Sequence, residues 1–89
     1  MDDMLRPYTP GQPESVTEAE MKALVAQTAP GETYTAESLY LRYRRICEGA
    51  GMRPASSSAL GRRLRTEGWT PGRKRHGTVR VWTRPEATA

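Results

Sequence analysis

The chain is poor in the residues that usually build disulfides, catalytic centres and membrane spans. It has one cysteine (Cys47), one histidine (His76) and no phenylalanine among 89 residues. A single cysteine excludes an intrachain disulfide and a zinc site with several cysteine ligands. No apolar run approaches the roughly 20 residues of a membrane-spanning helix. The acidic, proline-containing start "MDDMLRPYTP" is not typical of a signal peptide. We therefore expect an intracellular protein with no membrane partner, and Cys47 as a small core residue.

Catalytic chemistry has little support in this sequence. His76 lies in a predicted turn and has no second histidine as a partner. Most carboxylates fall in the first half of the chain, and no phosphate-binding loop of the form G-x-x-x-x-G-K-[ST] is present. We expect no enzymatic activity, no cofactor, no metal and no small-molecule substrate.

The two halves of the chain carry opposite charge. Residues 1–37 hold two cations and seven anions, whereas residues 38–89 hold twelve cations and three anions, so the net charges are −5 and +9. Such asymmetry favours a polyanionic partner for the second half. The length suits one small domain. Its core must come from aliphatic residues, tyrosines and two tryptophans.

Local signals predict two helices and a short strand in the first half. Thr17 and Glu20 form a capping box, which starts a helix over about residues 18–28. "TYT" at 33–35 is prone to form a strand. Thr35 then caps a helix over about 36–49, whose apolar stripe includes Tyr43 and Cys47. A glycine, Gly49 or Gly51, ends this second helix.

A third helix is predicted over about residues 57–67, with Ser56 as its N-cap and Gly68 as its C-cap. Leu60 and Leu64 share its inner face. Gly61 inside a helix costs about 1 kcal/mol relative to alanine. A close contact with another helix would explain this glycine.

A β-hairpin is predicted around His76-Gly77, which resembles the Asn-Gly turn signal. With a two-residue loop, Arg73 lies opposite Arg80. Val79 and Val81 share one face of the second strand, and Thr78, Arg80 and Trp82 share the other. The pattern leaves open which face Trp82 uses to reach the core, and so whether Arg80 contacts a partner or packs on the indole.

The order helix, strand, helix, helix, hairpin predicts an α+β fold of the winged-helix type. The strand at 33–35 can pair with the hairpin to make a three-stranded sheet. The predicted domain spans residues 16–83. We expect residues 1–15 to form a flexible, disordered leader and residues 84–89 a polar tail.

Two basic elements stand out as candidates for DNA binding. The outer face of the third helix offers arginines with few acids beside them, although a solvated helix face is the simpler interpretation. The three serines at its start can bind a phosphate, although Ser56 also serves as a cap. The hairpin places like charges opposite one another, which a polyanion would relieve, although charge also protects a sheet edge from aggregation. The candidate contact residues are Ser56, Ser57, Ser58, Arg62, Arg63, Arg65, Thr66, Arg73, Lys74, Arg75, His76, Thr78 and Arg80.

Four short motifs follow one another from about residue 39 to residue 82: "LYLRYRRICEGAG", "RPAS", "LGRRL" and "GTVRVW". This pattern resembles the C-terminal winged-helix domain of phage and plasmid primase–helicases, a type also found in poxviruses. The resemblance covers roughly half of the chain. It implies a DNA-binding winged helix with Arg62 on the recognition helix and a basic wing at the DNA backbone. The chain lacks the ATPase and primase domains of that family, so the resemblance implies no helicase activity. The matching residues are Leu39, Tyr43, Cys47, Pro54, Ser56, Leu60, Gly61, Arg62, Leu64, Gly68, Gly77, Arg80 and Trp82.

We therefore expect a protein that binds double-stranded DNA in the replication or transcriptional regulation of a phage, plasmid or other mobile element. Its expected place is the bacterial cytoplasm, at the nucleoid. A winged-helix module that docks on proteins without reading DNA, for example through an exposed Leu41, is the main alternative. Binding of single strands or RNA is a weaker one, because solvent-facing aromatic side chains are scarce. A homodimer and a larger replication or regulatory complex both stay open.

Overall fold

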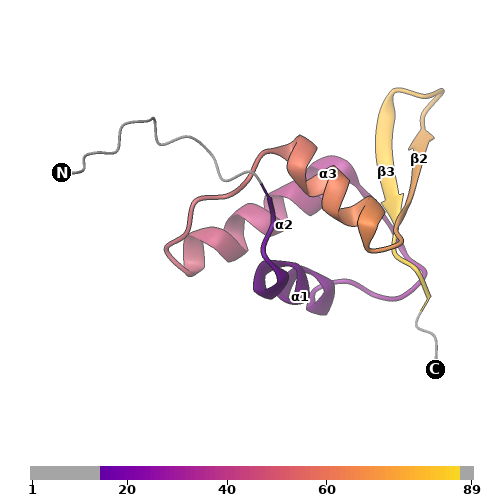
Figure 1. Ribbon diagram of the computed structural model, residues 1–89. Helices are drawn as coiled ribbons and strands as arrows, with labels where there is room; N and C mark the ends of the chain where they lie inside the picture. The colour runs from indigo at the N-terminus through magenta and orange to yellow at the C-terminus, as the bar shows by residue number, and fades with distance from the viewer. Residues whose placement is uncertain (1–14, 87–89) are drawn as a thin grey trace.

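The computed structural model describes residues 15–86. The predicted leader, except for Ser15, and the last three residues of the predicted tail lie outside the described residues. The described part is an α+β fold in the predicted element order, with three helices and one antiparallel sheet of three strands (Figure 1). No described helix is long and apolar enough to cross a membrane. The elements are α1 (Glu18–Ala26), β1 (Thr33–Thr35), α2 (Ala36–Gly49), α3 (Ser57–Thr66), β2 (Thr70–Lys74) and β3 (Val79–Thr83).

Each helix begins at the predicted N-cap. Thr17 Oγ1 accepts a hydrogen bond from the Glu20 amide at 3.1 Å, and the Glu20 carboxylate accepts one from the Thr17 amide at 3.0 Å. Thr35 and Ser56 each accept a hydrogen bond from the backbone N–H three residues on. These bonds satisfy amides that the first turn of a helix leaves without a partner. The helix starts are therefore encoded within a few residues of sequence.

The helix ends depend on glycine. Gly51 and Gly68 follow α2 and α3 and have positive φ angles of 71° and 92°. The Met52 amide bonds the Cys47 carbonyl, and the Trp69 amide bonds the Leu64 carbonyl. The amides of both glycines also bond carbonyls of the last turn, which completes the Schellman pattern. Each glycine therefore follows the C-cap residue of its helix and is not itself the C-cap that the sequence predicted. Helix α1 ends at Ala26, two residues earlier than predicted.

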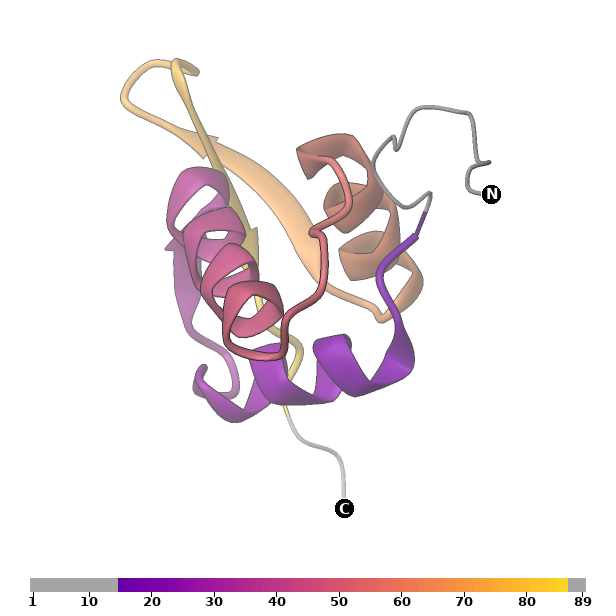
Figure 2. The same ribbon diagram turned by 90° about the vertical axis from the view of Figure 1, so that its left-hand side faces the viewer.

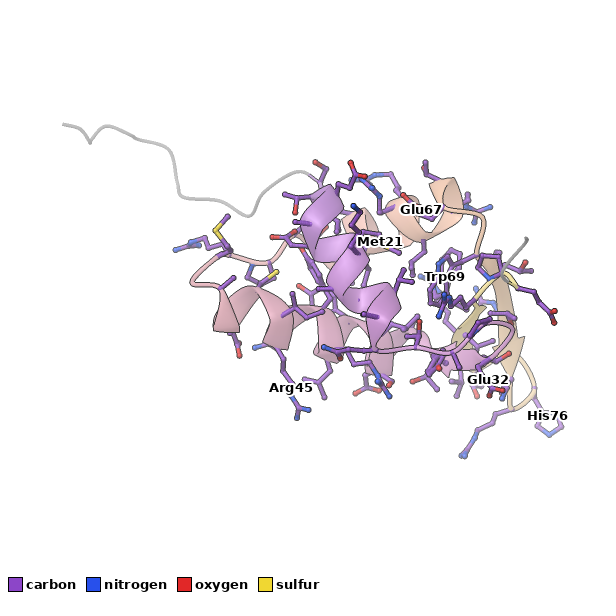
Figure 3. All side chains as sticks on the ribbon, turned by 90° about the horizontal axis from the view of Figure 1, so that it is seen from below. Met21, Glu32, Arg45, Glu67, Trp69 and His76 are labelled. Atoms are coloured by element: carbon purple, nitrogen blue, oxygen red, sulfur yellow. The ribbon has the colours of Figure 1, made fainter. Side chains whose placement is uncertain are left out.

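The sheet has the order β1-β3-β2, so β3 is the central strand. Pairing of residues 33–35 with the hairpin is confirmed. Arg73 pairs with Arg80, which is the predicted register of the hairpin. The β2 residues are all exposed, and the hairpin extends beyond the helices in both ribbon views (Figures 1 and 2). His76 lies at the far end of this projection (Figure 3).

Both tryptophans belong to the core. Trp69 and Trp82 are 3 % and 9 % exposed, and Cys47 is fully buried. Trp82 lies on the sheet face toward α3, because a Cβ on Gly61 would meet the Trp82 ring at 3.7 Å. Gly61 therefore faces the sheet, and the expected close contact with another helix is wrong. A distance of 3.7 Å is ordinary van der Waals contact, so this packing does not require glycine.

A chain of hydrogen bonds joins α1 and α2 to the segment that precedes α3. The Ala55 amide donates to the Tyr43 hydroxyl at 2.7 Å, and that hydroxyl lies 3.4 Å from the Glu20 carboxylate. The Tyr40 hydroxyl donates to the Ala55 carbonyl at 2.8 Å. Two tyrosines of α2 thus hold both backbone polar groups of the residue that precedes the α3 N-cap. Burial raises the pKa of Tyr43, and burial also raises the pKa of the Cys47 thiol, so both groups keep their protons at neutral pH.

Candidate nucleic-acid interface

Helix α3 presents its polar side chains on the face opposite the core. Leu60 and Leu64 are buried, whereas Arg62 and Arg65 are exposed. Successive residues of a helix are rotated by about 100° around its axis, which places the two leucines on one side and the two arginines on the other. The buried tyrosine contacts at Ala55 fix where the helix starts, and so fix the direction in which its arginines point.

The β2–β3 hairpin contributes two further arginines, Arg73 and Arg80. Arg73 and Arg80 are directly opposite each other in the β2–β3 ladder, so both side chains leave the same face of the sheet. Trp82 shares this face by strand parity. Its burial at the α3 contact shows that the face is the one turned toward α3. The sequence left open which way this shared face of Arg80 and Trp82 points, and the structure turns it toward α3.

Helix α3 and the hairpin enclose two adjoining hollows. The first holds about 600 Å³ and is lined by Arg62, Arg65, Arg80 and Trp82, among others. The second, of about 360 Å³, is lined by Arg65, Arg73, Arg80 and Trp82, among others. Arg65, Arg80 and Trp82 border both hollows, so the two elements form one continuous surface. We name its arginines and serines the basic face, which consists of Ser57, Ser58, Arg62, Arg65, Arg73 and Arg80.

The indole that supports this surface contacts Arg65 rather than Arg80. The Arg65 guanidinium carbon lies 5.9 Å from the centroid of the Trp82 ring, within the range of a cation–π interaction. This contact orients a side chain that would otherwise move freely. A held guanidinium loses less conformational entropy when it binds a planar acceptor such as a phosphate or a guanine edge.

The positive charge of the basic face is not neutralised by carboxylates. Within the part of the chain that the structure describes, none of its four arginines takes part in an ion pair. The ion pairs found there, such as Arg44 with Glu48 at 3.6 Å, lie on other surfaces. Uncompensated cations repel one another and attract polyanions. The arrangement therefore stores repulsion that a bound polyanion would relieve.

Several predicted contact residues have other roles or positions. Arg63 bonds Glu67 at 2.9 Å and the Val16 carbonyl at 3.2 Å, so it lies apart from the basic face. The Thr66 hydroxyl donates to the Arg62 carbonyl within the helix. Ser56 accepts the capping bond described above.

The tip of the hairpin is a tight turn with unusual backbone angles. Arg75, His76 and Gly77 have φ angles of 56°, 58° and 85°. Two overlapping turns result, in which the Gly77 amide bonds the Lys74 carbonyl and the Thr78 amide bonds the Arg75 carbonyl. The Thr78 hydroxyl also donates to that Arg75 carbonyl, at 2.7 Å. Two non-glycine residues in the left-handed region cost about 1–2 kcal/mol each. The turn nevertheless exposes Lys74, Arg75 and His76 at the most distant point of the fold.

The start of α2 contributes residues that the sequence did not indicate. Ala36, Glu37 and Tyr40 line the first hollow together with the arginines. Their presence follows from the β1–β3 pairing, since Thr35 lies opposite Val81 and α2 begins at the next residue. The expected pairing of residues 33–35 with the hairpin was the signal that could have located them.

The comparisons with protein-family models, with curated proteins and with solved structures found no match. Within residues 15–86 no three His, Cys, Asp or Glu side chains cluster in a way that could hold a metal ion. The chemistry that the basic face offers is hydrogen bonding and charge pairing with an anion, from planar guanidinium groups and two serine hydroxyls.

Proposed function

We propose that this chain is a winged-helix module that binds double-stranded DNA. In this proposal α3 is the recognition helix and the β2–β3 hairpin is the wing. The observed element order and the three-stranded sheet are compatible with that fold. The partner is a duplex, because a helix with an adjoining hairpin matches the width of a major groove and its flanking backbone.

The observation that carries the proposal is the convergence of Arg62, Arg65, Arg73 and Arg80 on one face. They come from two elements that are separate in the sequence, and no carboxylate in the described chain pairs with them. A solvated helix face alone would not require arginines on the adjacent hairpin to point in the same direction. A polyanion that spans both elements accounts for the arrangement.

In the proposed complex, α3 enters the major groove. Arg62 and Arg65 reach base edges, where a bidentate contact to guanine contributes about 1–3 kcal/mol of discrimination. Arg73, Arg80 and the exposed cations of the hairpin tip contact phosphates or the minor groove. Phosphate contacts set register and general affinity, and base contacts set sequence preference.

A setting in the replication or transcription of a phage, plasmid or other mobile element is part of the proposal. It rests on the resemblance of the motifs between residues 39 and 82 to primase–helicase winged helices. A bacterial, nucleoid-associated location follows from the same resemblance.

A protein-docking module is the second candidate, because Leu41 and Met52 are large apolar residues that are 45 % and 53 % exposed. Light scattering on the purified chain, with and without duplex, separates the two. A dimer whose mass does not change with added duplex favours protein docking. A shift to a protein–DNA complex favours the proposed function.

A matched pair of arginine variants tests the proposed surface. Arg65→Gln removes a charge from the basic face, and Arg44→Gln removes one from α2, where Arg44 lines neither hollow. Binding to a duplex selected from a random pool should weaken roughly 5- to 150-fold in Arg65→Gln if that side chain reads a base. It should change less than about twofold in Arg44→Gln, whose charge is exposed and screened. Equal effects of the two variants would contradict the proposal.

A further inference from the structure

One carboxylate borders the basic face. Glu37 lines the first hollow with Arg62, Arg65 and Arg80. It also lines a smaller hollow on the hairpin side, again with Arg80. The β1–β3 register explains this position, because Thr35 pairs with Val81 and Glu37 follows two residues later. Glu37 is exposed, so a ligand on the basic face can reach it.

Its neighbours do not neutralise it. Within residues 15–86 Glu37 forms no ion pair, so its carboxylate stays more than 4.0 Å from the charged nitrogens of the arginines that share its hollow. A carboxylate that served to fix Arg80 or Arg65 would approach one of them. Glu37 therefore faces the same solvent-filled space as the arginines and is available to a bound molecule.

A helix-stabilising role does not distinguish this residue. Glu37 lies in the first turn of α2, where a negative charge favours the helix by about 0.3–1 kcal/mol. Glu18 has the same role in the first turn of α1, on a different surface. The two residues therefore share the dipole effect and differ in whether they border the basic face, which makes Glu18 a matched control.

We infer that Glu37 is a specificity-determining residue of the proposed DNA-binding surface. A carboxylate repels phosphates, so it lowers affinity for a duplex of any sequence. In a major groove it accepts a hydrogen bond from the N4 amino group of cytosine, whereas guanine and thymine present no amino donor there. The base contact widens the gap between preferred and random sequences, whereas the repulsion lowers the affinity for both alike. This inference rests on the proposed function.

The test is a selection from random duplexes followed by binding measurements on the full chain, on Glu37→Ala and on Glu18→Ala. Alanine is used because glutamine would keep an oxygen that can accept from cytosine. The wild-type chain should enrich cytosine at one position, with a preference of roughly 5- to 150-fold over guanine and thymine. Glu37→Ala should lose that preference, and Glu18→Ala should retain it. On a random duplex Glu37→Ala should bind roughly two- to fivefold more tightly than Glu18→Ala, about the size of one close charge contact in water.

The outcomes separate the two levels of the proposal. Retention of the same cytosine preference in Glu37→Ala, or no cytosine preference in a wild-type chain that binds duplex, overturns the role of Glu37 alone. Equal random-duplex affinity of the two variants also overturns it. Failure of the wild-type chain to bind any duplex at low salt overturns the proposed function and this inference together.

Discussion

Removal of one hydroxyl should show that α3 depends on α2 for its position. Tyr43→Phe deletes the acceptor of the Ala55 amide, a bond of 2.7 Å in the fully buried interior. It also removes the hydroxyl that lies 3.4 Å from the Glu20 carboxylate. No water can replace the lost acceptor, since Tyr43 and Ala55 are both 0 % exposed. A buried donor left unsatisfied costs about 1–3 kcal/mol.

Tyr40→Phe is the matched control. Its hydroxyl donates to the carbonyl of the same residue, Ala55, at 2.8 Å, but Tyr40 is only partly buried. Tyr40 borders the first hollow, so water can enter the space that its hydroxyl leaves, and the expected loss is the net value of one hydrogen bond, about 0.5–1.5 kcal/mol. The two variants thus remove the same chemical group from the same helix and differ in burial.

Urea denaturation followed by circular dichroism measures both. With an m value of about 1 kcal/mol/M, Tyr43→Phe should lower the urea midpoint by about 1–3 M, and Tyr40→Phe by about 0.5–1.5 M. A midpoint in Tyr43→Phe that equals or exceeds that of Tyr40→Phe would refute the reasoning. It would mean that the buried hydrogen bonds of Tyr43 do not hold the segment before α3 in place.

Two further predictions concern stability. Gly61→Ala should stabilise the fold by about 1 kcal/mol through helix propensity, because the added Cβ meets Trp82 at 3.7 Å; a lowered melting temperature would show that the contact is too tight. Stability should also fall at high pH. The pKa values of Tyr43 and Cys47 are raised by burial, so the folded state binds these protons more tightly than the unfolded chain. The contribution of Cys47 is complete below about pH 8.5 and declines above it, and that of Tyr43 declines above about pH 10. The urea midpoint of Cys47→Ala should fall less steeply from pH 8.5 to 10 than that of the wild-type chain, and equal slopes would contradict this account.

Elements whose cause lies within a few residues could be predicted from the sequence. Thr17, Thr35 and Ser56 cap their helices because each side chain bonds an amide only three residues away. The hairpin register follows from one turn and a ladder of adjacent residues. Such local signals do not depend on where the rest of the chain folds.

Features that depend on distant contacts could not be predicted in the same way. The hydrogen bond from Arg63 to the Val16 carbonyl spans 47 residues, and no local pattern in the sequence indicates it. Parity also could not assign the face of Trp82, because Val81 beside it is buried as well. Arg84, within the predicted polar tail, donates to the Thr28 carbonyl at 2.7 Å near the end of α1. The sequence predicted the part of the candidate site that lies on α3 and the hairpin. It did not indicate Glu37, which comes from α2 and reaches the site only through the β1–β3 pairing.

The central claim is that the basic face binds the phosphate backbone of a duplex. Fluorescence anisotropy of a labelled duplex, titrated with the full chain over a series of salt concentrations, tests it most directly. Neutralisation of about five phosphates predicts a slope of log affinity against log salt near −4 to −5, at about 0.9 per phosphate. A flat dependence on salt, or no binding at low salt, would contradict the claim.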